Sequence, residues 1–372
     1  MPYIHEHPDW PKLRWDDARL LPLLADVRHR QGRLLGRMEG LGLRLRSEAT
    51  LTTLTADVIK SSAIEGEILD PVQVRSSLAR RLGFDFGGQV PAGQEVEGVV
   101  EMMLDATQKY DQPLTAERLF AWHAALFPTG RSGLRRITVG AWRPADIGPM
   151  QVVSGPIGRE RIHFEAPAAD RLDREVALFL KWFNADDDLD PVLKSGLAHF
   201  WFVTIHPFED GNGRISRALA DLALARAEGM VERYYSLSAQ IESEKKSYYL
   251  YLEQSHSGGV DITAWLEWFL GCLGRAVAGA TDALAAILLK ARTWERINQH
   301  TSVNDRQRKV INRLLDGFEG KLSTSKYARL AQCSPDTALR DIHHLMTQGI
   351  LIQSEGGGRN TRYHLVTPGP PA

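Results

Sequence analysis

Residues 206–217 read His-Pro-Phe-Glu-Asp-Gly-Asn-Gly-Arg-Ile-Ser-Arg. The segment before them, 192–204, is apolar on most faces and predicts a buried helix. Pro207 makes helical geometry unfavourable at His206, so this histidine should lie just beyond the helix end. A helical pattern rich in Ala and Leu resumes at 214–228. The run therefore predicts a loop between two core helices, with His206 facing a cleft.

The same run combines a base, a carboxylate and a loop suited to anions. Glycines before a helix N-terminus leave backbone N–H groups free to point at an anion, and the helix dipole helps. Asp210 suits Mg²⁺, which takes one or two carboxylates together with phosphate oxygens. Arg214 and Arg217 are three residues apart on one helix face and can bind the same phosphates. Each piece alone has an ordinary role, such as a turn or an N-cap. Together they predict a site for a nucleotide triphosphate.

This run resembles the signature of the Fic family, His-Pro-Phe-x-(Asp/Glu)-Gly-Asn-Gly-Arg-x-x-Arg, and matches every defined position. The resemblance implies an all-helical Fic core that transfers AMP from ATP to a protein hydroxyl. By position, His206 would be the general base, Phe208 would anchor the loop in the core, and Asp210 would bind Mg²⁺. The resemblance also assigns the phosphates to five residues: Gly211, Asn212, Gly213, Arg214 and Arg217.

A small β-hairpin is expected upstream of the signature. Residues 130–165 lose the helical period, and strands are predicted at 151–153 and 161–164 around a turn at 154–158. The resemblance to the Fic family implies that this hairpin is a flap, which holds the target protein by strand pairing.

Tyr248 and Tyr249 lie on a predicted helix that ends near Ser255. The resemblance suggests that aromatic residues here border the adenine pocket, whereas tyrosines on helices also serve as core residues. Because the two are adjacent on a helix, we do not expect both to face one pocket comfortably.

Residues 61–66, Ser-Ser-Ala-Ile-Glu-Gly, resemble the inhibitory motif of the same family, (Ser/Thr)-x-x-x-Glu-(Gly/Asn). Ser61 and Glu65 share one helical face, and Gly66 suits the position that ends the helix. The resemblance implies that Glu65 pairs with Arg217 and takes the place of the γ-phosphate. Two alternatives stay open: an ordinary surface glutamate, or a carboxylate that positions water to remove AMP from a modified protein.

The remaining pattern predicts a mainly α protein with three parts. These are an N-terminal helical region over 1–90, a Fic core over 91–290 and a C-terminal domain over 301–372. In the first two parts, helices are expected at 20–40, 47–63, 71 onward with Asp70 as N-cap, 95–109, 115–126 and 171–184.

The C-terminal part resembles a winged helix-turn-helix domain. Helices are predicted at 304–318, 324–331 and 335–348, followed by strands at 350–353 and 361–365 around Gly356–Gly358. Residues 301–372 contain ten Lys and Arg against six Asp and Glu, a modest surplus for DNA binding. Both DNA binding and protein docking stay open for this domain.

Composition excludes several classes of protein. The chain has 372 residues, 43% hydrophobic and 24% charged, with a formal net charge of −1, which is typical of soluble globular proteins and not of a polyanion coat. Cys272 and Cys333 lack metal-ligand spacing. The N-terminus is no signal peptide, and charges interrupt the apolar stretch 262–289, so we expect core helices, no membrane span and a cytoplasmic protein.

Two functions follow. The first is a self-inhibited adenylyltransferase that uses ATP and Mg²⁺ to modify a Ser, Thr or Tyr hydroxyl of a protein, including itself. The second is a nucleotide-sensing regulator that binds DNA through its C-terminal domain. A homodimer is compatible with either function.

Overall fold

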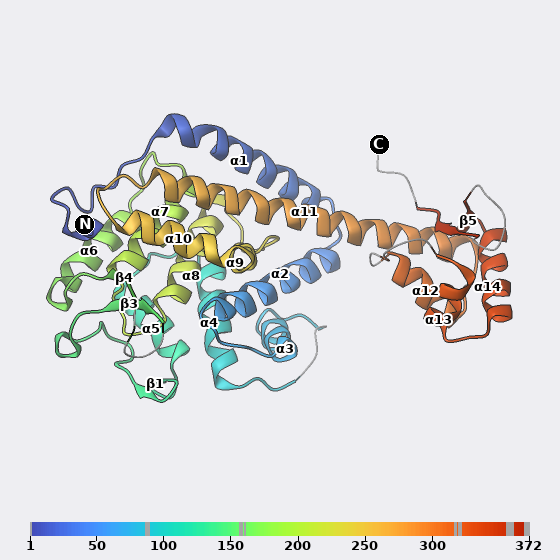
Figure 1. Cartoon of the computed structure of the whole chain (residues 1–372), viewed down its shortest axis with the longest axis horizontal. Helices are drawn as coiled ribbons and strands as arrows, with labels where there is room; N and C mark the ends of the chain where they lie inside the picture. The colour runs from blue at the N-terminus through green and yellow to red at the C-terminus, as the bar shows by residue number, and fades with distance from the viewer. Residues whose placement is uncertain are drawn as a thin grey trace. The chain divides into compact units, whose positions relative to one another are not determined.

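The computed structural model of the chain describes residues 2–85, 90–155, 159, 161–315, 318, 322–354 and 361–367. The chain divides into two compact units, Met1–Ala280 and Thr281–Ala372. Helices dominate both units, and the strands form small antiparallel pairs (Figure 1). The predicted fold class, mainly α with a small β-hairpin, is confirmed.

The core of the larger unit is built around α7 (Pro191–Ile205) and α8 (Asn212–Glu228), the two helices that flank the signature loop. Asp190 caps α7 by accepting a hydrogen bond from the Val192 N–H at 2.8 Å, and Pro191 occupies the first turn. Both helices are buried on nearly all sides, so the loop between them is held at both ends by the core. The helices that contribute to this core are α2 (Leu43–Ile64), α3 (Pro71–Arg81), α4 (Gln94–Gln108), α5 (Ala116–Leu126) and α6 (Leu172–Phe183).

Further helices complete the unit. They are α1 (Asp17–Glu39), α9 (Leu237–Ser243), α10 (Lys245–His256) and the start of α11 (Thr263–His300), with short 3-10 turns at Ile4–Glu6, Ala145–Ile147 and Ala169–Arg171. Helix α1 runs beside the first half of α11, where Arg19 donates to Glu267 at 2.6 Å (Figure 1). Asp70 caps α3 as predicted, accepting from the Val72 N–H at 2.7 Å.

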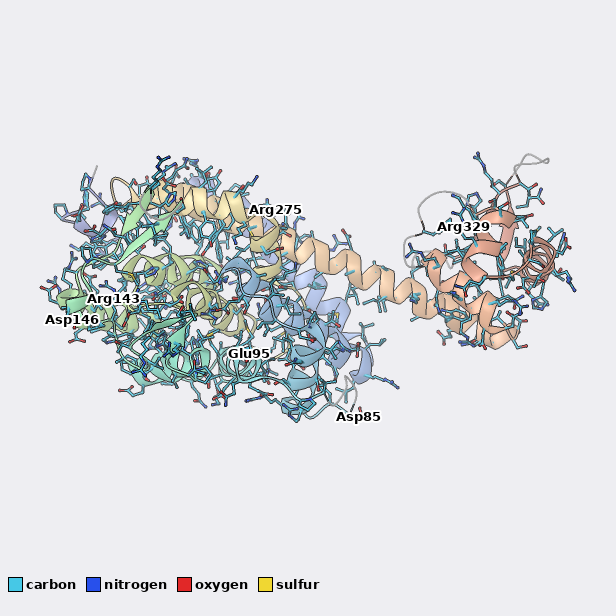
Figure 2. All side chains as sticks on the ribbon, turned by 60° about the horizontal axis from the view of Figure 1, so that its bottom comes forward. Asp85, Glu95, Arg143, Asp146, Arg275 and Arg329 are labelled. Atoms are coloured by element: carbon cyan, nitrogen blue, oxygen red, sulfur yellow. The ribbon has the colours of Figure 1, made fainter. Side chains whose placement is uncertain are left out.

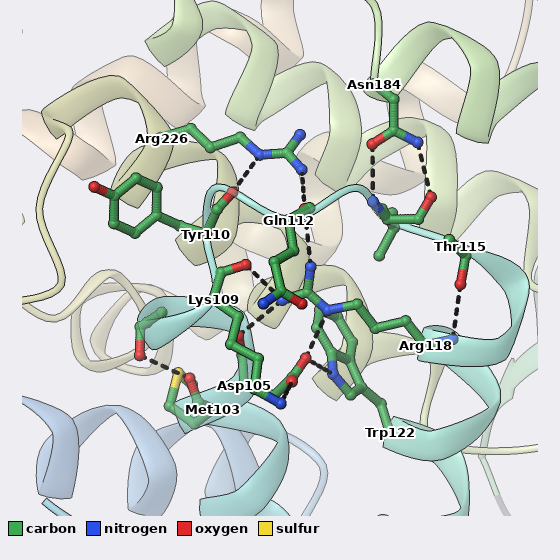
Figure 3. A network of polar contacts seen from close by, with 12 residues as sticks. Met103, Asp105, Lys109, Tyr110, Gln112, Thr115, Arg118, Trp122, Asn184 and Arg226 are labelled. Carbon is green, nitrogen blue, oxygen red and sulfur yellow. Dashed lines mark hydrogen bonds and ion pairs between the residues drawn. The ribbon is translucent and has the colours of Figure 1, made fainter.

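A polar network fixes the connection between α4 and α5 against the end of α8 (Figure 3). Arg118 donates to the Asp105 carboxylate at 2.6 Å. Arg226, in the last turn of α8, donates to the backbone carbonyls of Tyr110 at 2.6 Å and Gln112 at 2.7 Å. The far end of α8 is thereby tied to neighbouring elements.

The predicted hairpin is present as β3 (Gln151–Ser154) and β4 (Arg161–Glu165), with Gln151 opposite Glu165 and an irregularity after Val152. Residues 156–158 of the predicted turn lie outside the described residues. A second pair, β1 (Arg131–Ser132) and β2 (Arg135–Arg136), was not predicted, because two-residue strands carry no alternation of polar and apolar residues.

The smaller unit has its own core. Helices α12 (Asp305–Leu315), α13 (Thr324–Ala331) and α14 (Pro335–Thr347) pack with the strands β5 (Leu351–Gln353) and β6 (Tyr363–Leu365). The order of elements is the predicted one, although α12 ends at Leu315 and Gly356–Gly358 lie outside the described residues. The assignment as a winged helix-turn-helix stays a prediction.

Helix α11 is continuous through the apolar stretch. Within the described part of the chain, Thr263–Gln299 is the one helix long and apolar enough to cross a membrane, by length and composition only. Its first half supplies core side chains of the larger unit, including Trp265, Phe269 and Leu273. That half is a core helix, as predicted, and the absence of a membrane span stays a prediction.

Candidate active site

His206 ends helix α7 in a left-handed conformation, with φ 50° and ψ 57°. Its Nδ1 lies 3.2 Å from the Val203 carbonyl oxygen. Because a carbonyl only accepts, Nδ1 carries the proton in the neutral ring, and Nε2 keeps a free lone pair. Burial lowers the pKa of His206 to about 4, and the charge of Arg143 acts in the same direction. The side chain is therefore a neutral base at pH 7.

The loop after His206 is closed by the core. Phe208 is fully buried, and its ring stacks on His123 with 4.1 Å between centroids. The Asn212 amide donates to the Phe208 carbonyl at 2.8 Å and accepts from the Phe208 N–H at 3.0 Å. The Asn212 side chain is therefore used inside the loop, and its assignment to the phosphate cradle stays a prediction. Only its backbone N–H, in the first turn of α8, could face an anion.

Two glycines give the loop its shape. Gly211 has φ +81°, and a Cβ there would lie 2.9 Å from the Phe127 ring. Gly213 lies in the first turn of α8, and a Cβ there would lie 2.1 Å from Oε1 of Glu65. The Glu65 carboxylate therefore covers the backbone at the N-terminus of α8, where an anion would bind.

Asp210 has one carboxylate oxygen near the Ser132 hydroxyl, and the other accepts from the Gly211 N–H at 2.5 Å. The neighbouring Glu209 is tied to Arg135 at 2.9 Å and to the Thr138 N–H at 2.9 Å, so it is not available to an ion. No group of three or more His, Cys, Asp or Glu side chains among the described residues could hold a metal. Asp210 would bind Mg²⁺ only together with phosphate oxygens, which is the arrangement that Mg²⁺ favours.

Arg217 is buried against the inhibitory motif. Its Nη2 donates to Glu65 Oε1 at 2.7 Å and to the Ser61 carbonyl at 2.9 Å, and its Nε donates to the Ser61 hydroxyl at 2.9 Å. Its side chain is 1% exposed, whereas that of Glu65 is 31% exposed. The predicted pair of Glu65 and Arg217 is present, and Nη1 of Arg217 has no partner among the described residues.

Arg214, the other arginine of the signature, is paired as well, and the sequence did not predict this pair. Arg214 Nη1 donates to Glu67 at 2.5 Å, and the Arg214 guanidinium lies over the Phe127 ring. Burial raises the pKa of Glu67, despite the opposing effect of Arg214. Glu65 and Glu67 are two residues apart, and together they bind both arginines of the signature.

Gly66 makes this arrangement geometrically workable. It has φ +86°, its N–H donates to Ala63 at 3.1 Å, and the N–H of Glu67 donates to Ser62 at 3.0 Å. These two bonds are the Schellman pattern that ends many helices. The turn places Glu65 and Glu67 on the same side of the α2 terminus.

A pocket of about 720 Å³ opens beside His206. Its walls include Glu65, Gly213, Tyr248 and Tyr249. Tyr248 is almost fully buried, with its hydroxyl 2.9 Å from Nε2 of His199, whereas Tyr249 is 40% exposed. The expectation that adjacent tyrosines would not both face one pocket is wrong, because Tyr248 contributes as part of the buried wall and Tyr249 as an accessible ring.

The hairpin forms another wall of this pocket through Val152, Val153 and Ser154 of β3 and His163 and Phe164 of β4. His163 bridges the hairpin to α10, because its Nδ1 lies 2.8 Å from Glu253. The predicted flap therefore borders the same cavity as His206.

The comparisons with known proteins agree with this geometry. Residues 113–224 match the model of the Fic/DOC family, a range that contains the whole signature and the hairpin. The chain is a Fic-domain protein. Residues 3–84, which carry Ser61, Glu65, Gly66 and Glu67, match a domain of unknown function (DUF4172).

Several relatives of this Fic-domain protein are named protein adenylyltransferase Fic. The relative from Culex quinquefasciatus is 29% identical over 223 residues, covering 59% of this chain and 40% of the relative. The relative from Drosophila melanogaster is 26% identical over 278 residues, covering 71% and 51%. The relative from Nematostella vectensis is 31% identical over 144 residues, covering 37% and 30%. The chain thus spans about half or less of the length of these relatives.

Two solved structures share the fold. A Fic family protein from Desulfovibrio desulfuricans G20 aligns over the whole of both chains, with a TM-score of 0.55 and 23% identity. A Fic domain containing signaling protein from Bacteroides thetaiotaomicron aligns over 68% of this chain and 95% of its own, with a TM-score of 0.50 and 18% identity. At these identities the likeness concerns the fold alone.

Proposed function

We propose that this Fic-domain protein transfers AMP from ATP to a Ser, Thr or Tyr hydroxyl of a protein. The observation that carries the proposal is the position of His206, which borders a pocket shared with the N-terminus of α8 and holds its Nδ1 toward the Val203 carbonyl. The names of the relatives support AMP as the transferred group and a protein as the acceptor.

The residues divide the work of an in-line displacement. His206 Nε2 accepts the proton of the acceptor hydroxyl as its oxygen forms a bond to the α-phosphorus, and the bond to the leaving pyrophosphate breaks. The first N–H groups of α8 face the phosphates, and Arg214 and Arg217 offset the charge at the leaving end. His206 then returns its proton to solvent. A bound anionic nucleotide would favour the protonated imidazole and so raise the pKa of His206.

Asp210 is the residue that would bind Mg²⁺, alongside phosphate oxygens. The ion, when bound, would neutralise charge on the phosphates of the leaving group. The role of the protein is to present a single, oriented carboxylate next to the α8 N-terminus, and the bond from the Gly211 N–H sets that orientation.

The pocket has a suitable size for a nucleoside. Small-molecule sites commonly measure roughly 300–1,000 Å³, and the cavity beside His206 has about 720 Å³. The ring of Tyr249 is accessible for stacking on the adenine, and Tyr248 packs behind it with 5.1 Å between ring centroids.

We further propose that the protein is self-inhibited. A triphosphate needs the guanidinium groups that Glu65 and Glu67 occupy, and the Glu65 carboxylate also covers the α8 N-terminus at Gly213. An arginine–carboxylate pair in a partly dry cleft is strong enough to compete with a phosphate. Removal of the inhibitory contact should therefore raise AMP transfer. The same site could also run in the reverse direction. In that case Glu65 would position a water molecule that removes AMP from a modified protein.

The alternative function is a nucleotide-sensing regulator that binds DNA through the C-terminal unit. The order α12, α13, α14 and the β5–β6 hairpin is the feature that keeps this alternative open. It predicts salt-sensitive binding to a specific duplex without ATP-dependent labelling of any protein.

Intact-protein mass spectrometry after incubation with ATP and Mg²⁺ tests the proposed function. Transfer of AMP to the chain itself or to an added protein fraction should increase the mass of a protein by about 329 Da, the mass that in-line transfer of AMP adds. His206→Ala should abolish the increase. Labelling that persists in His206→Ala would contradict the assignment of the base.

A further inference from the structure

Arg143 is a buried cation with an unusual set of partners. It lies between β2 and β3, on the segment that leads into the hairpin, and Figure 2 labels it. Its exposed fraction is 2%. Among the described residues no carboxylate forms an ion pair with it, and burial lowers the pKa of its guanidinium to about 10. A charge kept in such a place without a counterion needs another reason.

The partners of Arg143 are backbone carbonyls of two separate chain segments. Its Nε donates to the His206 carbonyl at 2.8 Å, and its own N–H donates to the Pro207 carbonyl at 2.9 Å. Its Nη2 donates to the carbonyl of Pro167, which lies two residues after β4. One side chain thus joins the catalytic loop to the base of the hairpin.

His206 is a residue that needs such support. Its left-handed backbone is uncommon for a residue other than glycine and costs of order 1 kcal/mol or more, so it persists where neighbours enforce it. Its N–H donates to the Phe202 carbonyl at 3.0 Å, which fixes the peptide on the α7 side. Arg143 fixes the carbonyl on the other side.

We propose that Arg143 is a positioning residue for His206, which holds the histidine backbone in its left-handed conformation and couples that geometry to the base of the β3–β4 hairpin. The inference rests on the proposed role of His206 as the base. The charge of Arg143 also acts on His206, because a nearby cation disfavours the protonated form of the imidazole. The other charged or titratable groups that face His206 are Glu65 from α2, Asp210 from the loop and His256 from α10.

The test compares variants in the full chain that carries Glu65→Gly, so that transfer is measurable. Arg143→Met removes the cation and every side-chain bond, and Arg143→Lys keeps a cation with one flexible donor. Arg226→Met is the matched control, since Arg226 is a partly buried arginine that is also bonded to backbone carbonyls, but at the other end of α8. Thermal unfolding of each variant records the loss of stability that both methionine variants should share.

Two measurements separate positioning from general stability. Arg143→Met should lower kcat by about 10- to 100-fold, the range expected for a small displacement of a reacting group, with a much smaller change in the KM for ATP. Arg143→Lys should recover part of kcat. The imidazole of His206, followed by NMR, should titrate at higher pH in Arg143→Met than in the parent and in Arg226→Met.

The NMR titration keeps this inference distinct from the proposed function, because it needs no activity. If the parent transfers no AMP, the proposed function fails, and the His206 titration still decides whether Arg143 acts on this histidine. An unchanged His206 titration in Arg143→Met, or an equal loss of kcat in Arg226→Met, would overturn the inference. If Arg143→Met does not fold, Arg143→Lys is used for the test. The expected result is then a His206 titration close to that of the parent together with an intermediate kcat. A kcat equal to that of the parent would contradict the inference.

Discussion

At the residue scale, two carboxylates from one helix terminus meet two arginines from one helix start. Glu65 and Arg217 could be matched from the sequence because each belongs to a motif of defined spacing. Glu67 could not, because 147 positions separate it from Arg214 and no motif position marks it. Charge balance could have pointed to Glu67. Two buried arginines favour two carboxylate partners, and Glu67 is the next acidic residue after Glu65. Arg143 gave no signal, since its partners are backbone carbonyls.

Glu67→Gln tests whether the second carboxylate contributes to inhibition. The amide cannot neutralise Arg214, so the arginine becomes more available to phosphate, and ATP-dependent labelling should rise by several-fold. Glu242→Gln is the matched control, because it removes a partly exposed ion pair between α9 and Lys60 of α2. Labelling rates of the two variants and the unmodified chain are the measurement. Equal rates in all three would show that the pair of Glu67 and Arg214 has no inhibitory role.

At the element scale, local sequence rules predicted where helices begin, but they did not predict the contacts that shape the site. Asp70 with Pro71 begins α3 where the sequence placed it, because an N-cap and a first-turn proline act within a few residues. Asp190 with Pro191 and Ser334 with Pro335 begin α7 and α14 in the same way. The pairing of β1 with β2 and the internal use of the Asn212 amide depend on contacts formed only in the folded protein.

The turn at Gly66 predicts a second result at this scale. In Gly66→Ala, a side chain meets no neighbour within 4 Å but must adopt φ +86°, which costs about 1 kcal/mol. The strain falls on the turn that places Glu65 and Glu67, so labelling should increase. Gly229→Ala has the same kind of strain, at φ +64° with open space, at the far end of α8.

Both alanine variants should lose similar stability, measured by denaturant unfolding. Only Gly66→Ala should gain AMP transfer. A gain of the same size in Gly229→Ala would mean that general loosening of the protein, and not the geometry of the inhibitory turn, releases the site.

At the scale of the whole molecule, the sequence predicted three parts, over 1–90, 91–290 and 301–372, and the structure has two compact units, Met1–Ala280 and Thr281–Ala372. What the sequence did not show is how many titratable groups the larger unit buries. Burial lowers the pKa of His123 and His206 to about 4, and that of His199 and His256 to about 3. Burial acts in the opposite direction on the carboxyls of Asp57 and Asp221 and raises their pKa.

The histidines predict a loss of stability in mild acid. Each has a folded pKa below its unfolded value of about 6.5, so its contribution is complete above pH 6.5 and is lost as the pH falls, while the two aspartates offset part of this loss. His199→Gln removes one such group and should make the free energy of unfolding less dependent on pH, by roughly 1.4 kcal/mol per pH unit between about pH 4 and 6. Parallel pH profiles for the unmodified chain and His199→Gln would contradict the burial of a neutral His199.

We propose that the α2 terminus holds the AMP transferase inactive. The most direct measurement is the incorporation of AMP from α-labelled ATP into protein by the unmodified chain, by Glu65→Gly and by Glu65→Gly combined with His206→Ala. We predict weak labelling by the first, at least about tenfold more by the second, as expected for the loss of a charge-assisted bond worth roughly 1.5–3 kcal/mol, and none by the third. Equal labelling by the first two, or labelling that survives the loss of His206, would contradict the claim.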